Sequence, residues 1–380
     1  MQRKAGMSQT SVSPVSARRA VRVAVAVLAA VALLAPAGYL FSRVWSSSTD
    51  TRDFNRAERR GVAYLGPLTE LLSVVTEAQS TAVRGEKVDV GPVRAAVAEV
   101  DEVDGRLGAE LGTTERWTAI RQTVVDRTAR DWSDRAAAYV QYSDLVTTLM
   151  ELTRKVGDVS NLILDPQLDA YYVMNATLLR IPEILVDSGR YTDLSVLAVR
   201  RSRTDGVSVA QLTTARNRVA TNATDLADGL VKAFASTGSE TLGPGLTRQL
   251  DDFRTAVDAV APSNSMLAPA PERTESNLAA DQDQLQRAAL ALQEAGLAEL
   301  DRLLAVREDA ATRTRVLSLL AAALVAAVTV AAVVAVGLLP DGARSAVRDP
   351  DDDPLRTGEP SHRGTPELIS AGPRGGARAG

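Results

Sequence analysis

The stretch GDVSNLILDPQLDAYYVMNATLLRIPEI, residues 157–184, holds the side chains whose types and spacing could do chemistry. Asp165 and Asp169 are two acids four positions apart, and acid pairs support hydrolysis by general acid–base catalysis. The stretch supplies neither a defined leaving-group site nor a second type of catalytic residue. We therefore expect that these acids do not catalyse hydrolysis and that the protein is not an enzyme.

The same two acids fit the start of a helix. Asp165 precedes Pro166, and an aspartate N-cap followed by proline at the first helical position is a favoured helix start. Asp169 would lie in the first turn, where the helix dipole favours an acid. We predict a helix over residues 168–179 and a bend or break at Pro182, which cannot donate a backbone hydrogen bond.

Four residues of the stretch remain as candidates to line a ligand pocket: Tyr171, Tyr172, Asn175 and Arg180. Neighbouring residues on a helix point to different sides, so one tyrosine is expected in the core and the other is available. Alternatively, both tyrosines only fill the core and hydrogen-bond a neighbouring helix. Arg180 could capture an anion, or it could pair with acids at helical spacing on a solvated face.

The composition of the chain predicts the elements that carry these residues. The chain has 380 residues, of which 45% are hydrophobic and only 4% are aromatic. A core must therefore be built from Leu, Val and Ala, and Ala and Leu have high helix propensity. We predict an all-α fold.

Charge and rare residues exclude several classes of function. The formal net charge of −4 comes from 43 basic and 47 acidic residues, which gives no sign of a surface for nucleic acid. The chain has no cysteine, and its single histidine, His362, lies in a Gly/Pro-rich tail. A thiolate site, a disulfide, a catalytic Ser-His-Asp triad and a multi-histidine metal site therefore lack their residues. We expect no cofactor and no metal.

Two uncharged segments are long enough to cross a bilayer. Residues 23–41 and 316–339 are apolar runs close to the ~20 residues that a membrane-spanning helix needs. The N-terminal tail, 1–22, carries five basic residues and no acid, which favours a cytoplasmic location. We expect a two-pass protein of the cell membrane with residues 44–315 outside and both termini inside.

A second interpretation of the first apolar segment stays open. Ala35-Pro36-Ala37 resembles a small-residue cleavage site, so residues 23–41 could belong to a signal peptide. The protein would then be anchored by residues 316–339 alone. In both interpretations the large middle part of the chain lies outside the cell.

The region 44–315 shows helical periodicity. Leu65, Leu68, Leu72 and Val75 recur at spacings of three and four, as on one face of a helix. Similar stripes lie in 113–156, which we interpret as one long helix or two nearly continuous ones, in 212–230 and in 250–260. The last stripe, from Leu290 to Ala311, continues without a breaker into the second apolar segment.

The length of this region predicts its organisation. About 270 residues are many for one four-helix bundle and suit a long-helix bundle of two stacked modules. Breakers stand at 85–92, 238–245 and 261–272. The tail 340–380 is rich in Gly, Pro and charge without apolar periodicity, so we expect it to be disordered.

The stretch 157–184 resembles a signature of extracytoplasmic helical sensor regions in bacterial chemotaxis receptors, membrane diguanylate cyclases and sensor histidine kinases. The matching pattern, GD.SNL.LDP.LDSYYLMD…RLPE, is carried by Gly157-Asp158, Ser160-Asn161-Leu162, Leu164-Asp165-Pro166, Leu168-Asp169, Tyr171-Tyr172-Val173-Met174 and Arg180-Ile181-Pro182-Glu183. Ala170 stands where the pattern has Ser, and Asn175 where it has Asp. Such receptors continue after their second membrane helix into a HAMP linker and an output module, which this chain lacks.

The resemblance implies a sensor, and because the chain departs from the family after the second apolar segment we expect its output to come from another protein. We expect a homodimer in the membrane that binds an unknown small ligand and signals through a separate protein, such as a kinase, a cyclase or a chemotaxis component. The alternative is a structural or envelope module that binds another protein and has no small ligand.

Overall fold

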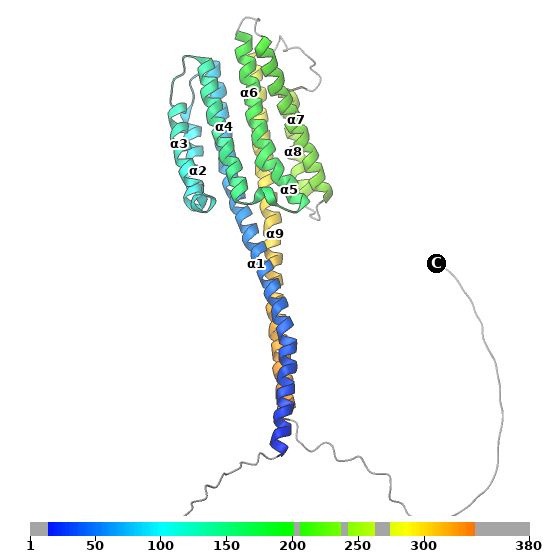
Figure 1. Cartoon of the computed structure of the whole chain (residues 1–380). Coiled ribbons are helices and arrows are strands. Elements are labelled where there is room, and N and C mark those ends of the chain that lie inside the picture. The colour runs from blue at the N-terminus through cyan, green and yellow to red at the C-terminus, as the bar shows by residue number, and fades with distance from the viewer. Residues whose placement is uncertain (1–13, 201–205, 237–241, 263–273, 339–380) are drawn as a thin grey trace, which may run out of the picture. The chain divides into compact units, whose positions relative to one another are not determined.

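The computed structural model describes residues 14–200, 206–236, 242–262 and 274–338 (Figure 1). Helices are the regular elements of these ranges, and no strand occurs in them, which confirms the all-α prediction. In chain order they are α1 (Pro14–Arg84), α2 (Val90–Leu111), α3 (Thr114–Thr128), α4 (Arg135–Val159), the short 3-10 helix η1 (Leu162–Leu164), α5 (Leu168–Met174), the π-helical turn η2 (Asn175–Arg180), α6 (Ile181–Arg200), α7 (Gly206–Ser236), α8 (Leu242–Val260) and α9 (Glu275–Leu338).

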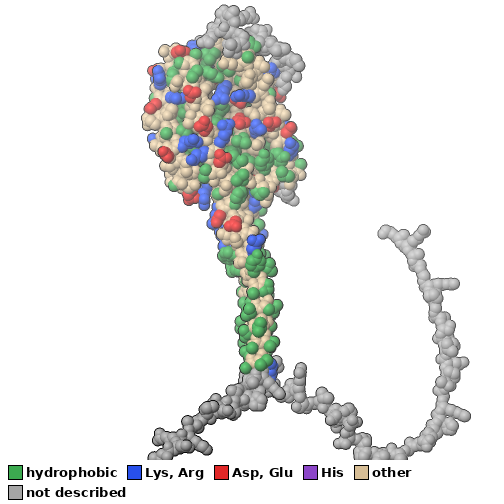
Figure 2. Space-filling view, viewed as in Figure 1, with side chains coloured by type: hydrophobic (Ala, Val, Ile, Leu, Met, Phe, Trp, Pro, Cys, Tyr) green, Lys and Arg blue, Asp and Glu red, His purple; other side chains and the backbone are tan. Residues whose placement is uncertain are grey.

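The two predicted membrane segments lie in the two longest helices. Residues 23–41 belong to α1, and residues 316–338 belong to α9. Only 6% of the apolar window of each helix is buried, which distinguishes both from the core helix of a soluble protein. Figure 2 shows hydrophobic side chains over the surface of these segments. Leu33, Leu40, Leu320 and Leu324 are among their exposed residues. Both helices are therefore long and apolar enough to span a bilayer.

The contacts divide the chain into two units. One unit contains, among the described residues, 14–30 and 330–338, which are the outer ends of α1 and α9. The other unit contains residues 31–329 and includes the stretch that the sequence singles out.

Within residues 31–329 two groups of helices lie side by side rather than stacked (Figure 1). The first group consists of α2, α3 and α4, the second of α5 to α8, and α4 contacts α6. The main cluster of buried hydrophobic side chains runs from Val62 in α1 to Leu304 in α9 and takes in residues of both groups. The predicted stacking of two modules is therefore wrong, because one core joins the groups laterally.

Most of the predicted stripes are buried as expected. Leu65, Leu68, Leu72 and Val75 are fully buried, and α9 runs unbroken from the core into the apolar segment. The interval 113–156 contains two helices, α3 and α4, separated by residues 129–134. The tails 1–13 and 340–380, His362 and most of the breaker 261–272 lie outside the described residues, so the predicted disorder of the C-terminal tail is not tested.

Candidate functional site

The motif begins with a turn that docks against α1. Ser160 is fully buried, and a Cβ built onto Gly61 of α1 would lie 2.6 Å from Ser160 Cβ and 2.7 Å from Leu162 Cδ1. The turn can approach α1 this closely only because residue 61 has no side chain. Between the two buried residues, Asn161 adopts the left-handed conformation with φ 63°. The Ser-Asn-Leu triplet therefore has a structural role.

The left-handed backbone at Asn161 leads to a first prediction. Asparagine and glycine tolerate this conformation, whereas a β-branched residue is strained there. We expect Asn161→Val to lower the free energy of unfolding by about 1–3 kcal/mol. Asn161→Gly should leave it within about 0.5 kcal/mol of the wild-type value. Urea unfolding of the full chain in detergent measures both, and an equal loss in the two variants would contradict a backbone origin.

The two acids of the motif bind one arginine of α9. The side chain of Asp165 is 1% exposed, and Arg307 Nη1 donates to its Oδ2 over 2.7 Å. Arg307 Nη2 donates to Asp169 Oδ1 over 3.4 Å. The other oxygen of Asp165 accepts from the backbone N–H of Gln167 at 2.9 Å. The motif is thereby attached to α9, nine residues before the apolar segment begins at Val316.

This geometry corrects one prediction and confirms another. Asp165 is not the N-cap and Pro166 is not the first helical residue, because α5 begins at Leu168 and Gln167 is its N-cap. The carboxylate of Asp165 is held by Arg307 and by a local turn instead of by the N–H groups of the helix. Asp169 does lie in the first turn of α5, as predicted.

Glu58 of α1 completes this contact region. It is fully buried, and the charges of Asp165 and Arg307 act on it directly. We use the name junction for the following set, which joins α1, the motif and α9: Glu58, Gly61, Ser160, Leu162, Asp165, Asp169 and Arg307. Sequence reasoning missed Glu58 and Arg307, since neither belongs to the motif and an isolated charge on a long helix usually faces solvent.

Pro182 does not break the helix. Helical backbone continues from Leu168 to Arg200, and the irregularity is the π turn Asn175–Arg180 directly before the proline. A proline removes a backbone donor and displaces the preceding turn, and a π turn is one way to accommodate this. The carbonyl of Thr177 in the π turn accepts a hydrogen bond of 3.0 Å from Gln293 Nε2 of α9. The irregular turn is therefore also attached to α9.

Arg180 ends the π turn and is already surrounded by acceptors. Its Nη1 donates to Asn222 Oδ1 over 2.8 Å and to Glu183 Oε2 over 3.3 Å, and its Nη2 lies 3.2 Å from Asp225 Oδ2. These contacts link the π turn to α7. The arginine therefore has the ion pairs that the sequence offered as the alternative to anion capture.

The tyrosines divide as predicted, one outward and one toward the core. Tyr171 is 39% exposed, whereas Tyr172 is half-buried against the core. Their rings meet edge to face with centroids 5.4 Å apart, and Lys232 Nζ lies 5.7 Å from the centroid of Tyr172. Asn175 is the first residue of the π turn. Neither cavity described below is lined by the four candidates, so their role in ligand binding stays a prediction.

A groove of about 320 Å³ lies where α4, α6 and α7 meet. Its polar lining comes from all three helices and consists of Thr147, Arg154, Arg190, Arg218, Glu183, Asp187 and Asn222. Its apolar lining includes Met150 and Val186. The groove borders the Arg180 cluster, because Glu183 and Asn222 belong to both.

The ion pairs inside the groove are loose. Arg190 and Arg218 lie 3.6 and 3.9 Å from Asp187, and Arg154 lies 3.6 Å from Glu183. These distances exceed the about 2.7–3.2 Å of a close hydrogen bond, so the acids hold the three guanidinium groups loosely. Arg190 Nη2 also donates to Thr147 Oγ1 over 3.1 Å. Burial raises the pKa of Asp187, and its two arginine neighbours oppose that rise. Three arginines against two acids leave the groove with an excess positive charge.

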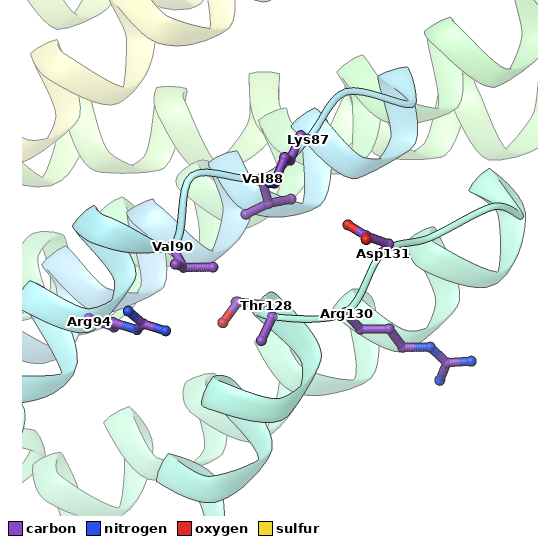
Figure 3. Close-up of a pocket in the computed structure, with 8 residues that line it drawn as sticks. Lys87, Val88, Val90, Arg94, Thr128, Arg130 and Asp131 are labelled. Carbon is purple, nitrogen blue, oxygen red and sulfur yellow. The ribbon is translucent and has the colours of Figure 1, made fainter.

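A second cavity, of about 210 Å³, lies between the loop that precedes α2 and the end of α3 (Figure 3). Lys87, Val88 and Val90 form one side, and Thr128 and Asp131 the other. The guanidinium of the neighbouring arginine at position 130 points away from the cavity and lies over a tryptophan ring at 4.6 Å. The lining also includes Arg94, so that three basic side chains and one acid border this cavity.

A row of buried polar side chains lies between α1, α6 and α9. Gln79 Nε2 donates to Asp193 Oδ2 over 2.7 Å, and Gln293 Nε2 donates to Thr69 Oγ1 over 3.1 Å. Burial raises the pKa of Asp193 to about 7, against the effect of its polar neighbours, among them the hydrogen bond from Gln79. The sequence signal that could have shown this row is the spacing of four, three and four in the buried residues Thr69, Ser73, Thr76 and Ser80.

Within the described part of the chain, no group of three or more acidic or histidine side chains is arranged to hold a metal ion. Comparisons with protein-family models, with curated proteins and with solved structures give no match. The resemblance of residues 157–184 to bacterial sensor regions therefore stays a prediction.

Proposed function

We propose that the protein is a membrane-anchored sensor whose external helices bind a small anionic or zwitterionic ligand and move α9 in response. Binding, rather than catalysis, is its function, and a separate protein of the membrane or the cytoplasm carries the signal onward. The observation that carries this proposal is that the π turn makes hydrogen bonds in two directions. Arg180 at its end donates to Glu183 and Asn222, which line the groove, and the turn accepts a hydrogen bond from Gln293 of α9.

The proposed topology rests on the ends of the two apolar segments. The guanidinium of Arg315 lies 4.1 Å from the ring centroid of Trp45, and Trp45 lies 5.7 Å from Phe41. Aromatic and arginine side chains are typical of the membrane–water interface. Because this contact joins the end of one apolar segment to the start of the other, both segments reach the interface at one level. A helical region 44–315 on the outer side of the membrane fits this arrangement.

Transmission requires an element that can adopt two arrangements. A π turn is a local irregularity that often occurs at functional sites, and its hydrogen bonds can shift to the α-helical pattern by moving one residue. A ligand that displaces the side chain of Glu183 or Asn222 would change the hydrogen bonds of Arg180, the last residue of this turn. The Thr177 carbonyl would then move relative to Gln293, and α9 would receive a small shift along or around its axis.

The chemistry of the groove defines the class of ligand. Arginines with unused donors favour a carboxylate or a phosphate, and the nearby acids accept an ammonium group. The apolar floor at Met150 and Val186 suits a short aliphatic part. Amino acids, small dicarboxylates and inorganic phosphate are therefore the compounds to test first.

A thermal-shift screen of the full chain in nanodiscs tests the proposal. A ligand present at about 100 times its Kd should stabilise the protein by about 2.7 kcal/mol. We expect Arg218→Ala to abolish this stabilisation, since Arg218 lines the groove and is 60% exposed, with one loose ion pair to Asp187.

The matched control is Arg248→Ala in α8. Arg248 is 88% exposed and its pair with Asp252 is equally long, at 3.9 Å, but it does not line the groove. This variant should keep the full ligand effect. If no compound stabilises the wild type while a membrane protein co-purifies through the external helices, the alternative of an envelope interaction module would replace sensing.

A further inference from the structure

Glu58 is a buried acid without a partner in the middle of the junction. Its relative exposure is 0%, and among the described residues neither of its carboxyl oxygens has a hydrogen-bond partner. Such a side chain is costly to bury in ionised form, since a buried carboxylate needs donors or an opposite charge. One turn earlier on α1, Asn55 is also buried, and its side-chain nitrogen likewise lacks a partner.

The charged groups that face Glu58 do not compensate a negative charge. From the motif side Asp165 faces it, and from α9 Arg307 faces it. Arg307 is already bound by Asp165 and Asp169. If Glu58 ionised, its carboxylate would compete with Asp165 and Asp169 for this guanidinium.

The neighbouring ion pairs between α1 and α9 do not change this balance. Arg56 and Arg59 of α1 donate to Glu308, and Arg59 also donates to Asp301. These arginines already have acids of their own and are partly exposed.

We propose that Glu58 makes the junction a proton-dependent switch, closed while its carboxyl is neutral and opened when the proton is lost to solvent. Opening separates α1 from the motif and from Arg307, so that the carboxylate gains water. Because α1 and α9 continue into the two apolar segments, the change reaches both. This switch involves only the residues of the junction, and it does not depend on ligand binding in the groove.

The acidity of Glu58 agrees with this geometry. Burial is the main cause that raises its pKa from 4.5 to about 8; Asp165 raises it further, and Arg307 opposes the rise. Because the folded-state pKa exceeds the ordinary value, the neutral carboxyl favours the closed state fully below about pH 4.5 and loses this effect as the pH rises through about 8. Asp193, whose pKa is about 7, is mostly ionised before the pH reaches the pKa of Glu58.

Spin labels on the full chain in nanodiscs can follow the switch, because the sequence has no native cysteine. Labels at Asp53→Cys in α1 and Thr314→Cys in α9 occupy exposed positions on the two long helices, between the junction and the apolar segments. We expect the distance distribution between the labels to broaden or lengthen between about pH 6.5 and about pH 9.5, with a midpoint near the pKa of Glu58.

Glu58→Gln should keep the narrow distribution across this range, because the amide imitates the neutral acid. Glu77→Gln, an exposed residue of the same helix, should respond to pH like the wild type. A wild type without a transition, or a transition that persists in Glu58→Gln, would overturn the proposal. Glu58→Met is a second neutral variant, and failure of both variants to fold at the lower pH would overturn it as well.

Discussion

Replacing Arg307 by alanine should destabilise the protein by about 3–5 kcal/mol, because it leaves the buried carboxylate of Asp165 without its cation. Asp165 is 1% exposed and would keep one hydrogen bond, from the N–H of Gln167, while Glu58 remains beside it. In thermal unfolding of the full chain in nanodiscs, we expect Tm to fall by roughly 6 °C or more.

Two comparisons separate this effect from loss of a surface charge. Arg287→Ala, on the same helix, removes an ion pair with Asp283 in which both side chains are more than half exposed, and should cost less than about 1 kcal/mol. Adding Asp165→Asn to Arg307→Ala should restore part of the lost stability, since the amide is uncharged. Equal stability of the single and the double variant would show that the Asp165 charge does not cause the loss.

The second large effect is expected at Gly61, where α1 touches the Ser160 turn. A Cβ at this position would lie 2.6 Å from Ser160 Cβ and 2.7 Å from Leu162 Cδ1, and both neighbours are fully buried. Gly61→Ala should therefore lower the free energy of unfolding by about 1–3 kcal/mol through overpacking. Urea unfolding of the full chain in detergent measures the loss.

Gly105→Ala is the matched control, and it should change the free energy of unfolding in the opposite direction. Gly105 lies inside α2, and an added Cβ would meet nothing within 4 Å. Alanine is the better helix former by up to about 1 kcal/mol, so this variant should be slightly more stable than the wild type. If both substitutions stabilise the protein, the contact between α1 and the Ser160 turn is looser than the structure shows.

Both effects concern the same feature, the attachment of the motif to the two long helices. Asp165 and Asp169 bind α9 through Arg307, and the Ser160 turn contacts α1 at Gly61. The residues that most resemble a sensor signature therefore hold this stretch against both long helices. The groove that we propose for the ligand lies elsewhere, between α4, α6 and α7, and its residues are mostly outside the motif.

The class of the fold and the two apolar segments could be predicted from the sequence. The composition requires a core of Leu, Val and Ala, and the stripe from Leu65 to Val75 identifies the buried face of α1. The uncharged runs 23–41 and 316–339 identify the two segments that are able to span a membrane. These properties follow from local spacing and from transfer of apolar surface out of water, so no knowledge of distant contacts is needed.

Which polar residues act together became visible only when the helices were seen packed. Nothing in the local sequence relates Asp165 to Arg307, which lies 142 residues away, or distinguishes the buried Glu58 from the exposed Glu77. Helix packing also pairs Asp165 with Arg307 of α9 instead of leaving it at a helix N-cap, and it gathers arginines of three helices into one groove. A polar side chain is defined by its partner and by its burial, and both are set when distant helices pack.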